Sequence, residues 1–530
     1  MGMTTKPPFS EHKVQESSSR IIVSRRIFAI LAIAVVLIGA GLRLPRLATR
    51  SLWYDEAVSA NNASGSLTET LMNTRNHNSS PILYPALLWA VGKLDHSALS
   101  MRLPAFASSI MLIILVIVVG RKFLGSDSAL LAGLLVALTP SQIHYAREAR
   151  EYALSGLFAC LMTFAYIDFE LNPGGRAQKL RLYATLALAP LIQYGLVLFG
   201  AAILCAMAWK GLAERRFRLL DMLFASASIG LTGLFSLLFT LRYQFKSSAG
   251  AWYLEEAFFT PGKMSLIKYV YHNGTSLLSF LCPGWIAGGL VAFGLAAVLV
   301  LTSHEDSRAL RRLLVCSGCI ALLAGLAHFY PFGGVRQCLY LGALVSVAGA
   351  VGIREIWRPL AESQTLRCIG IITAIVCISG FGTIISSGFY REKEDSQAIL
   401  ARLTQENARG DDVYVYYGAR PAVEFYLGRP AEPAARTLRM EVKWFPFYEE
   451  NTNGRHFIYG GVHQDQPHDY VRELLRAVMP TTERLWLVFS HIQPEDDRLI
   501  IDDLRAAGWS VTESLRATDA ILFQAKRGST

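Results

Sequence analysis

The chain has 530 residues, of which 52% are hydrophobic and 17% are charged, and its mean hydropathy is +0.33. These values exclude an ordinary soluble protein and indicate an integral membrane protein in a lipid bilayer. The net charge of +10 falls in short clusters between apolar runs, without a basic stripe or an aromatic stacking module, so we expect no nucleic acid partner.

The chain begins with a polar stretch followed by an apolar one. Residues 1–20 are polar and Ser-rich, and we expect a disordered cytoplasmic tail. Arg25 and Arg26 then precede the first apolar segment, residues 27–42, which has no small-residue cleavage site after it. The sequence therefore predicts a retained membrane anchor that opens a transmembrane domain over residues 21–389.

Further apolar segments follow the polar residues 43–100. They cover residues 104–120, 129–144, 153–169, 182–193, 196–209, 219–241, 276–302, 313–332, 338–352 and 368–389. With the first segment they predict a mainly α fold, a polytopic transmembrane helical bundle of about eleven spans. Residues 182–209 fit either one long helix or two short ones.

The Lys and Arg residues decide the orientation. The candidate inner loops carry Arg121 and Lys122; Arg176, Lys179 and Arg181; Lys210, Arg215, Arg216 and Arg218; Arg308, Arg311 and Arg312; and Arg354, Arg358 and Arg367. All of them fall on the inner side only if residues 182–209 cross the membrane twice. We therefore expect a multi-pass protein of the cytoplasmic (inner) membrane, with a cytoplasmic N-terminus and an extracytoplasmic C-terminal domain.

Residues 390–530 differ in character from the rest. Residues 413–417, 485–490 and 520–524 are predicted as strands, and residues 395–407, 469–478 and 496–507 as amphipathic helices, which indicates a small α/β domain. This segment has no Gly-rich phosphate loop, and His463, His468 and His491 have no metal-ligand spacing. We expect an accessory or acceptor-recognition domain rather than a second active site.

The first outer loop, residues 43–100, carries an adjacent acidic pair. Asp55 and Glu56 follow Trp53 and Tyr54 shortly after the first span. Such a pair can cap an interfacial helix, because acids favour a helix N-terminus. It can also take part in chemistry at the membrane surface, and the stretch alone leaves both interpretations open.

A second charged stretch lies at a predicted outer corner, residues 144–152. Arg147, Glu148, Arg150 and Glu151 place four charges in five residues, which is costly near hydrocarbon unless they pair with one another or with a ligand. The topology does not require Arg147, Arg150 or the later Arg336. Either a self-neutralising helix start or an anionic ligand accounts for them.

Taken together, these motifs resemble a known family. Leu-Trp-Tyr-Asp-Glu-Ala at 52–57, Ser-Pro-Ile-Leu-Tyr at 80–84, Arg-Leu-Pro at 102–104 and Ala-Leu-Thr-Pro at 137–140, running into residues 145–152, occur in this order. They resemble the polyprenyl-phosphate-dependent GT-C membrane glycosyltransferases, of the dolichyl-phosphate-mannose protein mannosyltransferase and aminoarabinose transferase types. Residues 330–336 carry a weaker likeness.

The resemblance implies an inverting membrane glycosyltransferase of cell-envelope glycan or lipopolysaccharide biosynthesis. It would move a sugar from a polyprenyl-phosphate-linked donor to a hydroxyl acceptor on a lipid, glycan or protein at the outer face. The family's first-loop acids fall on Asp55 and Glu56 as catalytic residues, with Asp55 as the base or a metal ligand. Arg147, Arg150 and Arg336 would bind the donor phosphate, because guanidinium groups bind phosphate through paired hydrogen bonds.

Other candidates orient or bind substrate, namely Glu148, Tyr152, Tyr84 and Arg102. Glu148 would orient an arginine or join Asp55 in a metal site. Carboxylates alone would suit Mg²⁺ or Mn²⁺, whereas zinc would usually require a histidine, and His77 is displaced from the family's His-Pro-Pro position. Tyr84 and Tyr152 are equally consistent with ordinary interfacial aromatics.

Two other functions remain as alternatives. A transporter or a lipid or oligosaccharide flippase would also suit about eleven spans, but it predicts charges at mid-membrane and a repeat relating the two halves, neither of which the sequence displays. An inactive family member could bind lipid and scaffold a polysaccharide assembly.

Overall fold

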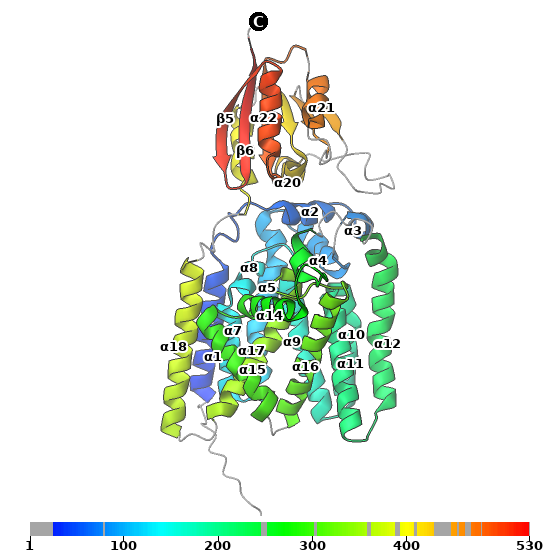
Figure 1. The fold of residues 1–530 in the computed structure, drawn as a ribbon, viewed down its shortest axis with the longest axis vertical. Coiled ribbons are helices and arrows are strands. Elements are labelled where there is room, and N and C mark those ends of the chain that lie inside the picture. The colour runs from blue at the N-terminus through cyan, green and yellow to red at the C-terminus, as the bar shows by residue number, and fades with distance from the viewer. Residues whose placement is uncertain are drawn as a thin grey trace, which may run out of the picture.

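The computed structural model describes residues 25–77, 80–244, 252–301, 305–357, 362–386, 393–406, 411–428, 447–452, 455–461, 468–478 and 480–528. They form a helical bundle with a small α/β domain at one end (Figure 1). This confirms the predicted fold class. The predicted N-terminal tail, residues 1–20, and His463 lie outside the described residues.

The described parts of the predicted apolar segments lie mainly on helices, although residues 327–332 follow the end of a helix. The bundle helices are α1 (Arg25–Arg43), α5 (Ala98–Val118), α6 (Gly120–Leu124), α7 (Ser126–Leu138), α8 (Pro140–Tyr145), α9 (Tyr152–Leu171), α10 (Arg176–Ile192), α11 (Gly195–Ala213), α12 (Leu219–Ser236), the π-helical η1 (Leu237–Leu241), α13 (Arg242–Gln244), α14 (Leu266–Leu281), α15 (Trp285–Leu301), α16 (Glu305–Leu326), α17 (Leu341–Trp357) and α18 (Glu362–Ser386).

Fewer helices are long enough to span a bilayer than the sequence predicts. Within the described residues, seven are long and apolar enough, or eight if the bent pair α14 and α15 counts as one span. The predicted segments at α7, α10 and α17 lie on helices of 13, 17 and 17 residues, shorter than the ~20 residues that cross hydrocarbon. Helix α7 ends at Leu138 because Pro140 starts α8, and its side chains pack among other helices.

Residues 182–209 form two helices rather than one. Helix α10 ends at Ile192, Gln193 is extended with φ −156° and ψ 140°, and α11 begins at Gly195. The two helices pack against each other within the bundle. The structure therefore has two helices here, which is the arrangement that the charge pattern favoured.

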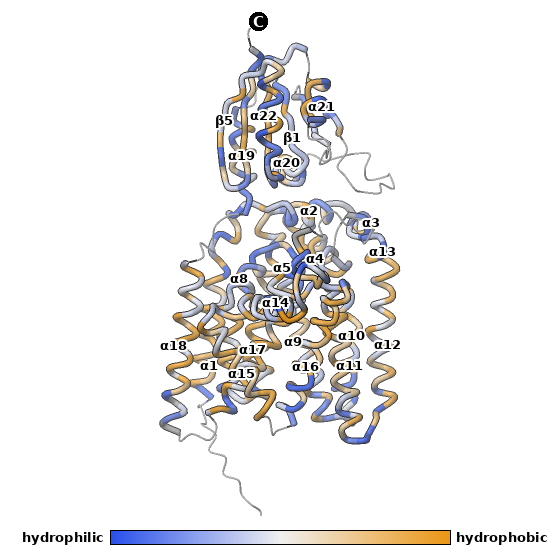
Figure 2. The backbone as a smooth tube through the Cα atoms, in the orientation of Figure 1, coloured by the Kyte–Doolittle hydropathy of each residue, from blue (hydrophilic) through white to orange (hydrophobic). Residues whose placement is uncertain are grey.

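The predicted inner loops meet at one end of the bundle. Their side chains form a chain of ion pairs, namely Lys122 and Arg181 with Asp168 at 3.0 and 2.8 Å, and Lys210 and Arg312 with Glu170 at 3.0 and 3.3 Å. Figure 2 shows hydrophilic helix tips at this end, opposite the C-terminal domain. The Lys and Arg clusters therefore share one face, as the positive-inside rule requires.

At the other end, short helices lie between the bundle and the C-terminal domain. These are α2 (Tyr54–Asn62), α3 (Leu67–His77) and α4 (Leu83–Gly92) (Figure 1). Gln244, at the end of α13, donates to the carbonyls of Thr74 and Ser80 at 2.9 and 3.1 Å. The first outer loop is thus tied to a second predicted outer segment.

A sharp bend between α14 and α15 lies near the same end. The two helices meet at 109°, and Gly284 in the bend has φ +86°. A Cβ atom there would come within 2.3 Å of the Thr383 hydroxyl on α18. Glycine is required at position 284 because the backbone there has a positive φ and because the bend packs tightly against α18.

The C-terminal domain contains one six-stranded sheet. Its strands are β1 (Asp412–Val415), β2 (Tyr448–Thr452), β3 (Arg455–Tyr459), β4 (Arg484–Ser490), β5 (Trp509–Ala517) and β6 (Ala520–Arg527), in the order β2-β3-β1-β4-β6-β5. Strand β1 pairs in parallel with β3 and β4, and the other pairs are antiparallel. The predicted strands correspond to β1, β4 and β6.

Helices cover both faces of this sheet. Helices α21 (Asp469–Ala477) and α22 (Asp496–Ala506) pack against Tyr414 and Leu487, whereas α19 (Ser396–Glu406) and α20 (Arg420–Leu427) pack against Val413 and Val415. Alternate residues of β1 therefore serve two separate cores, as the period of a strand dictates. The three predicted helices match α19, α21 and α22.

Candidate active site

The acidic pair lies in the first turn of α2, directly beneath the C-terminal domain. Trp53 is the residue before the helix, and its N–H donates to the Glu56 carboxylate at 3.4 Å. The helix-cap interpretation therefore holds for Glu56. Asp55 takes no part in this cap and contacts other residues instead.

Glu56 is fully buried and its carboxylate is already bound. Arg102 donates to its two oxygens from Nε and Nη2, both at 2.8 Å, and the Ala149 N–H donates to Oε1 at 2.8 Å. Burial would raise the pKa of Glu56, but the Arg102 charge and hydrogen bonds outweigh it and lower the pKa. Glu56 thus joins α2 to α5 and to the corner before α9.

The Arg102 guanidinium forms its hydrogen bonds with residues of the first outer loop. Beyond Glu56, its guanidinium donates to the carbonyls of Leu47, Arg50 and Ser51 at 3.0, 2.7 and 2.9 Å. These contacts fix the chain just before the acidic pair. The structure therefore brings Arg102 to the site as a support for the loop.

Asp55 pairs with Arg336 and is reachable from solvent. Arg336 Nη1 donates to Asp55 Oδ2 at 2.7 Å, and the two side chains are 18% and 22% exposed, respectively. Burial would raise the pKa of Asp55, but the charges of Arg150 and Arg336 lower it. Two of the arginines that topology left unexplained thus act on the same carboxylate.

Arg150 and Arg147 come from the corner between α8 and α9. Arg150 Nη1 donates to the Ser59 hydroxyl at 3.2 Å, and its guanidinium lies 5.8 Å from the ring centre of Tyr152. Arg336 approaches the same ring at 5.7 Å. Arg147 is buried in this corner, and its carbonyl accepts from Arg50 at 2.7 Å.

Glu148 is buried between His144 and Lys393. His144 Nε2 lies 2.9 Å from its Oε1, and Lys393 Nζ lies 2.5 Å from the same oxygen. Burial opposes ionisation, but Lys393 and then His144 hold the pKa of Glu148 well below its usual range. The Lys393 ammonium also lies 4.0 Å from the ring centre of Trp53.

Lys393 was not among the predicted site residues. It follows the last membrane helix, beyond the part of the chain that carries the family motifs, so no local pattern marked it. Tyr84 was predicted, and it is buried on α4. Burial, followed by the charges of Glu151 and Glu56, raises the pKa of Tyr84 well above its usual value.

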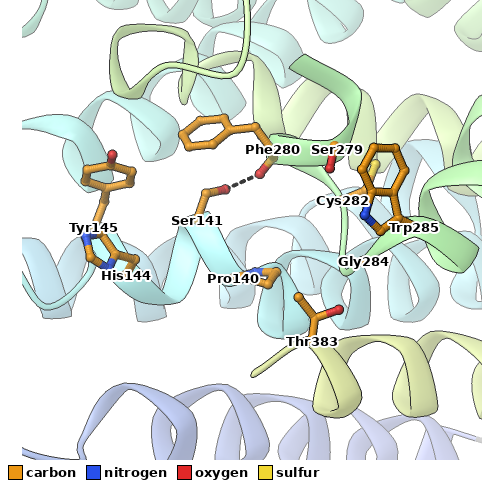
Figure 3. A pocket seen from close by; sticks show the side chains of 10 residues that line it. All are labelled: Pro140, Ser141, His144, Tyr145, Ser279, Phe280, Cys282, Gly284, Trp285 and Thr383. Atoms are coloured by element: carbon orange, nitrogen blue, oxygen red, sulfur yellow. Dashed lines mark hydrogen bonds between the residues drawn. The ribbon is translucent and has the colours of Figure 1, made fainter. Parts of the chain in front are cut away.

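A cavity of about 260 Å³ lies between α8, the α14–α15 bend and α18 (Figure 3). Its lining is mostly apolar and includes Phe280 and Trp285, with His144 and Tyr145 at one end. His144 contacts Glu148, and the Tyr145 ring packs edge-on against Tyr152 at 5.2 Å. The cavity is therefore joined to the charged site through α8.

A metal ion shared by Asp55 and Glu148 would compete with partners that both side chains already have. Arg336 pairs with Asp55, and Lys393 and His144 contact Glu148. Elsewhere in the part of the chain that the structure describes, Glu394, His491 and Asp519 bring three metal-binding groups together. The spacing of residues around His491 in the sequence could not indicate this cluster, because the three residues lie in distant segments.

Comparison with known proteins supports the resemblance seen in the sequence. Residues 79–239 match the family model described as dolichyl-phosphate-mannose-protein mannosyltransferase. No curated protein matches the chain. The fold is that of the GT-C membrane glycosyltransferases, as the structural matches confirm.

Two solved structures of ArnT from Cupriavidus metallidurans are similar over nearly the whole chain. The structure bound to undecaprenyl phosphate has a TM-score of 0.55 at 12% identity and covers 94% of this chain and 98% of its own. The apo structure has a TM-score of 0.54 at 12% identity, with 94% and 97% covered. The oligosaccharyltransferase AglB from Archaeoglobus fulgidus, in complex with an inhibitory peptide and a dolichol-phosphate, has a TM-score of 0.50 at 10% identity, with 93% and 74% covered.

Proposed function

We propose that this protein transfers a sugar from a polyprenyl-phosphate-linked donor to a hydroxyl acceptor at the outer face of the cytoplasmic membrane. The observation that carries the proposal is the solvent-reachable pair of Asp55 and Arg336 beside Arg150. The reaction needs a base for the acceptor proton and cations for the leaving phosphate, and these three groups supply both.

The transfer proceeds as one displacement. The acceptor oxygen forms a bond to the anomeric carbon while the bond from that carbon to the phosphate oxygen breaks. The acceptor proton passes to Asp55, and the electron pair of the broken bond stays on the polyprenyl phosphate. Because the acceptor attacks opposite the leaving group, the anomeric configuration inverts.

The Asp55–Arg336 pair links donor binding to the strength of the base. Arg336 now lowers the pKa of Asp55, following the larger charge effect of Arg150. A donor phosphate that accepts hydrogen bonds from Arg336 weakens this ion pair and allows the pKa of Asp55 to rise. Asp55 therefore becomes a better proton acceptor when the donor is in place.

The neighbouring residues support this chemistry in different ways. We assign Glu56 and Arg102 a positioning role, because the two side chains already form an ion pair with each other. Arg147 stays a candidate phosphate ligand from the same corner as Arg150, and Glu148 orients His144 and Lys393. Tyr84 and Tyr152 are candidates for contact with the sugar.

The apolar cavity beside α8 is the proposed place for the first isoprene units of the donor. His144 and Tyr145 line one end of it (Figure 3), and this end of α8 leads into the corner that carries Arg147 and Arg150. The positively charged inner loops gather at the end opposite the C-terminal domain. This supports a cytoplasmic N-terminus and an extracytoplasmic site.

A deletion strain provides the direct test. We expect the strain to lose one sugar modification of its surface glycans or lipids and to accumulate the corresponding polyprenyl-phosphate sugar. A plasmid copy of the wild type should reverse both changes, and an Asp55→Asn copy made to equal level should reverse neither. Unchanged lipid-linked sugars in the deletion strain would refute the proposal.

A further inference from the structure

We propose that Glu394, His491 and Asp519 bind one divalent cation of the zinc type, at the junction of the C-terminal domain and the catalytic turn. The three residues come from separate parts of the chain. Glu394 precedes α19, His491 directly follows β4, and Asp519 lies in the turn between β5 and β6. This inference goes beyond the proposed transfer reaction and does not depend on it.

The spacing of the three groups suits a single ion. Their ligand atoms all lie within 4.8 Å of one another, and His491 Nδ1 is 2.7 Å from Glu394 Oε1. A tetrahedral ion with bonds of about 2.1 Å holds its ligands roughly 3.4 Å apart. Small side-chain shifts therefore convert the present cluster into a coordination sphere.

A backbone amide holds one of the two carboxylates in place. The Tyr54 N–H donates to Glu394 Oε2 at 2.8 Å, which leaves Oε1 directed at His491. Metal ligands in proteins are commonly oriented by hydrogen bonds of this kind from outside the coordination sphere.

Two of the three groups are carboxylates, and only one cationic or neutral side chain, His491, stands with them in the cluster. A divalent cation between the two carboxylates would balance their charge. The composition of the cluster therefore suits a cation as well as its spacing does.

The donor set favours zinc over magnesium or calcium. One imidazole nitrogen with two carboxylate oxygens suits zinc, which takes nitrogen and oxygen ligands and can keep a water in the fourth position. Magnesium and calcium prefer oxygen ligands throughout. The histidine thus decides the class of metal.

The proposed metal lies next to the catalytic turn. Tyr54 donates its N–H to Glu394, and its ring stacks on His491 with centres 4.4 Å apart. The following residue is Asp55. Bound zinc would therefore fix the C-terminal domain against the start of α2 and make the junction more stable.

Zinc binding to the purified full-length protein tests the inference. Protein in detergent is stripped with a chelator, dialysed, and titrated with zinc by calorimetry, and its metal content is measured by elemental analysis. We expect one zinc per wild-type chain, with affinity at least tenfold lower in Asp519→Asn and His491→Ala. Asn suits the left-handed backbone at Asp519, where φ is +43°, so this variant keeps the turn.

His468→Ala is the matched control. His468 lies in the same domain and pairs with Asp503 on the surface at 2.7 Å, so its loss should leave zinc binding unchanged. Zinc should also raise the unfolding temperature of the wild type and of His468→Ala, but not of Asp519→Asn. Equal zinc binding by wild type and both site variants, or an equal stabilisation by magnesium, would overturn the inference.

Discussion

Arg336 donates to the Asp55 carboxylate at 2.7 Å although 281 positions separate the two residues in the chain. One comes from the first turn of α2 and the other from the short helix η3 (Arg336–Cys338) that precedes α17. The ion pair therefore joins the first outer loop to a corner near the end of the membrane domain, and it determines how the site responds to mutation.

Asp55→Asn is expected to lower sugar transfer by about 10²–10⁴-fold, because the amide cannot accept the acceptor proton. Folding should be retained, since Asn keeps the size of the side chain. Transfer is measured with the purified protein and its polyprenyl-phosphate sugar. Asp502→Asn, on the exposed face of α22, is the control and should transfer at the wild-type rate. Wild-type rates in Asp55→Asn would remove Asp55 as the base.

Arg336→Met is expected to shift the pH dependence of kcat/KM. Arg336 lowers the pKa of Asp55, so its removal raises that pKa. At a given acidic pH less Asp55 is then ionised, and the acid limb of the profile moves to higher pH. Arg402→Met, at an exposed position on α19, should leave the profile in place. A profile that does not move would show that Asp55 is not the titrating group.

Arg150→Ala is expected to weaken donor binding more than acceptor binding, because the guanidinium is proposed to bind the phosphate. Binding of a radiolabelled polyprenyl-phosphate sugar measures the first, and the KM for the acceptor measures the second. Arg216→Ala, in a predicted inner loop, serves for comparison. Equal donor binding by Arg150→Ala and wild type would contradict the phosphate role.

Glu56→Gln is expected to destabilise the protein by about 3–5 kcal/mol, because it breaks a buried ion pair and leaves Arg102 uncompensated. The folded-state pKa of Glu56 is lowered from its ordinary value of 4.5, so its contribution is present above that pH and is lost as the pH falls through the lower folded-state pKa. Thermal unfolding in detergent between neutral and acidic pH measures both effects. Glu214→Gln, near the inner end of α11, should unfold like the wild type.

Lys393→Met is expected to reduce transfer although Lys393 lies beyond the membrane helices. Its ammonium neutralises the buried Glu148 and packs over Trp53, next to the acidic pair. Lys393→Arg should recover part of the activity by restoring the charge. Lys526→Met, on strand β6, is the control. Full activity in Lys393→Met would make the contact with Glu148 incidental.

Much of the fold follows from local pattern. The apolar runs predict the bundle helices, and the strands β1, β4 and β6 are short apolar runs between polar residues. Strands β2, β3 and β5 were missed because their apolar runs are shorter or are interrupted by polar residues, as in Tyr-Glu-Glu-Asn-Thr at 448–452. Fewer described helices are long enough to span a bilayer by themselves than predicted, because α7, α10 and α17 have 13, 17 and 17 residues, a length that apolar composition does not reveal.

The sequence pointed to residues of the candidate site only where charged side chains stand out from their surroundings in the chain. Arg150 and Arg336 could be singled out because topology does not account for them, and Asp55 because it belongs to an adjacent acidic pair in a motif that resembles the family's first loop. The binding of Glu56 by Arg102 depends on a contact 46 positions apart, and no local pattern indicates it. His491 and Lys393 depend on the docking of the C-terminal domain, which brings together segments that share no sequence motif.

Two main-chain amides of the first outer loop donate hydrogen bonds to side chains at the C-terminal domain. The Leu52 N–H donates to the Tyr426 hydroxyl at 2.7 Å, and the Tyr54 N–H donates to Glu394 at 2.8 Å. Every residue except proline offers such an amide. These two attachments therefore do not depend on a particular side-chain donor in the loop, and a proline at either position should remove one of them.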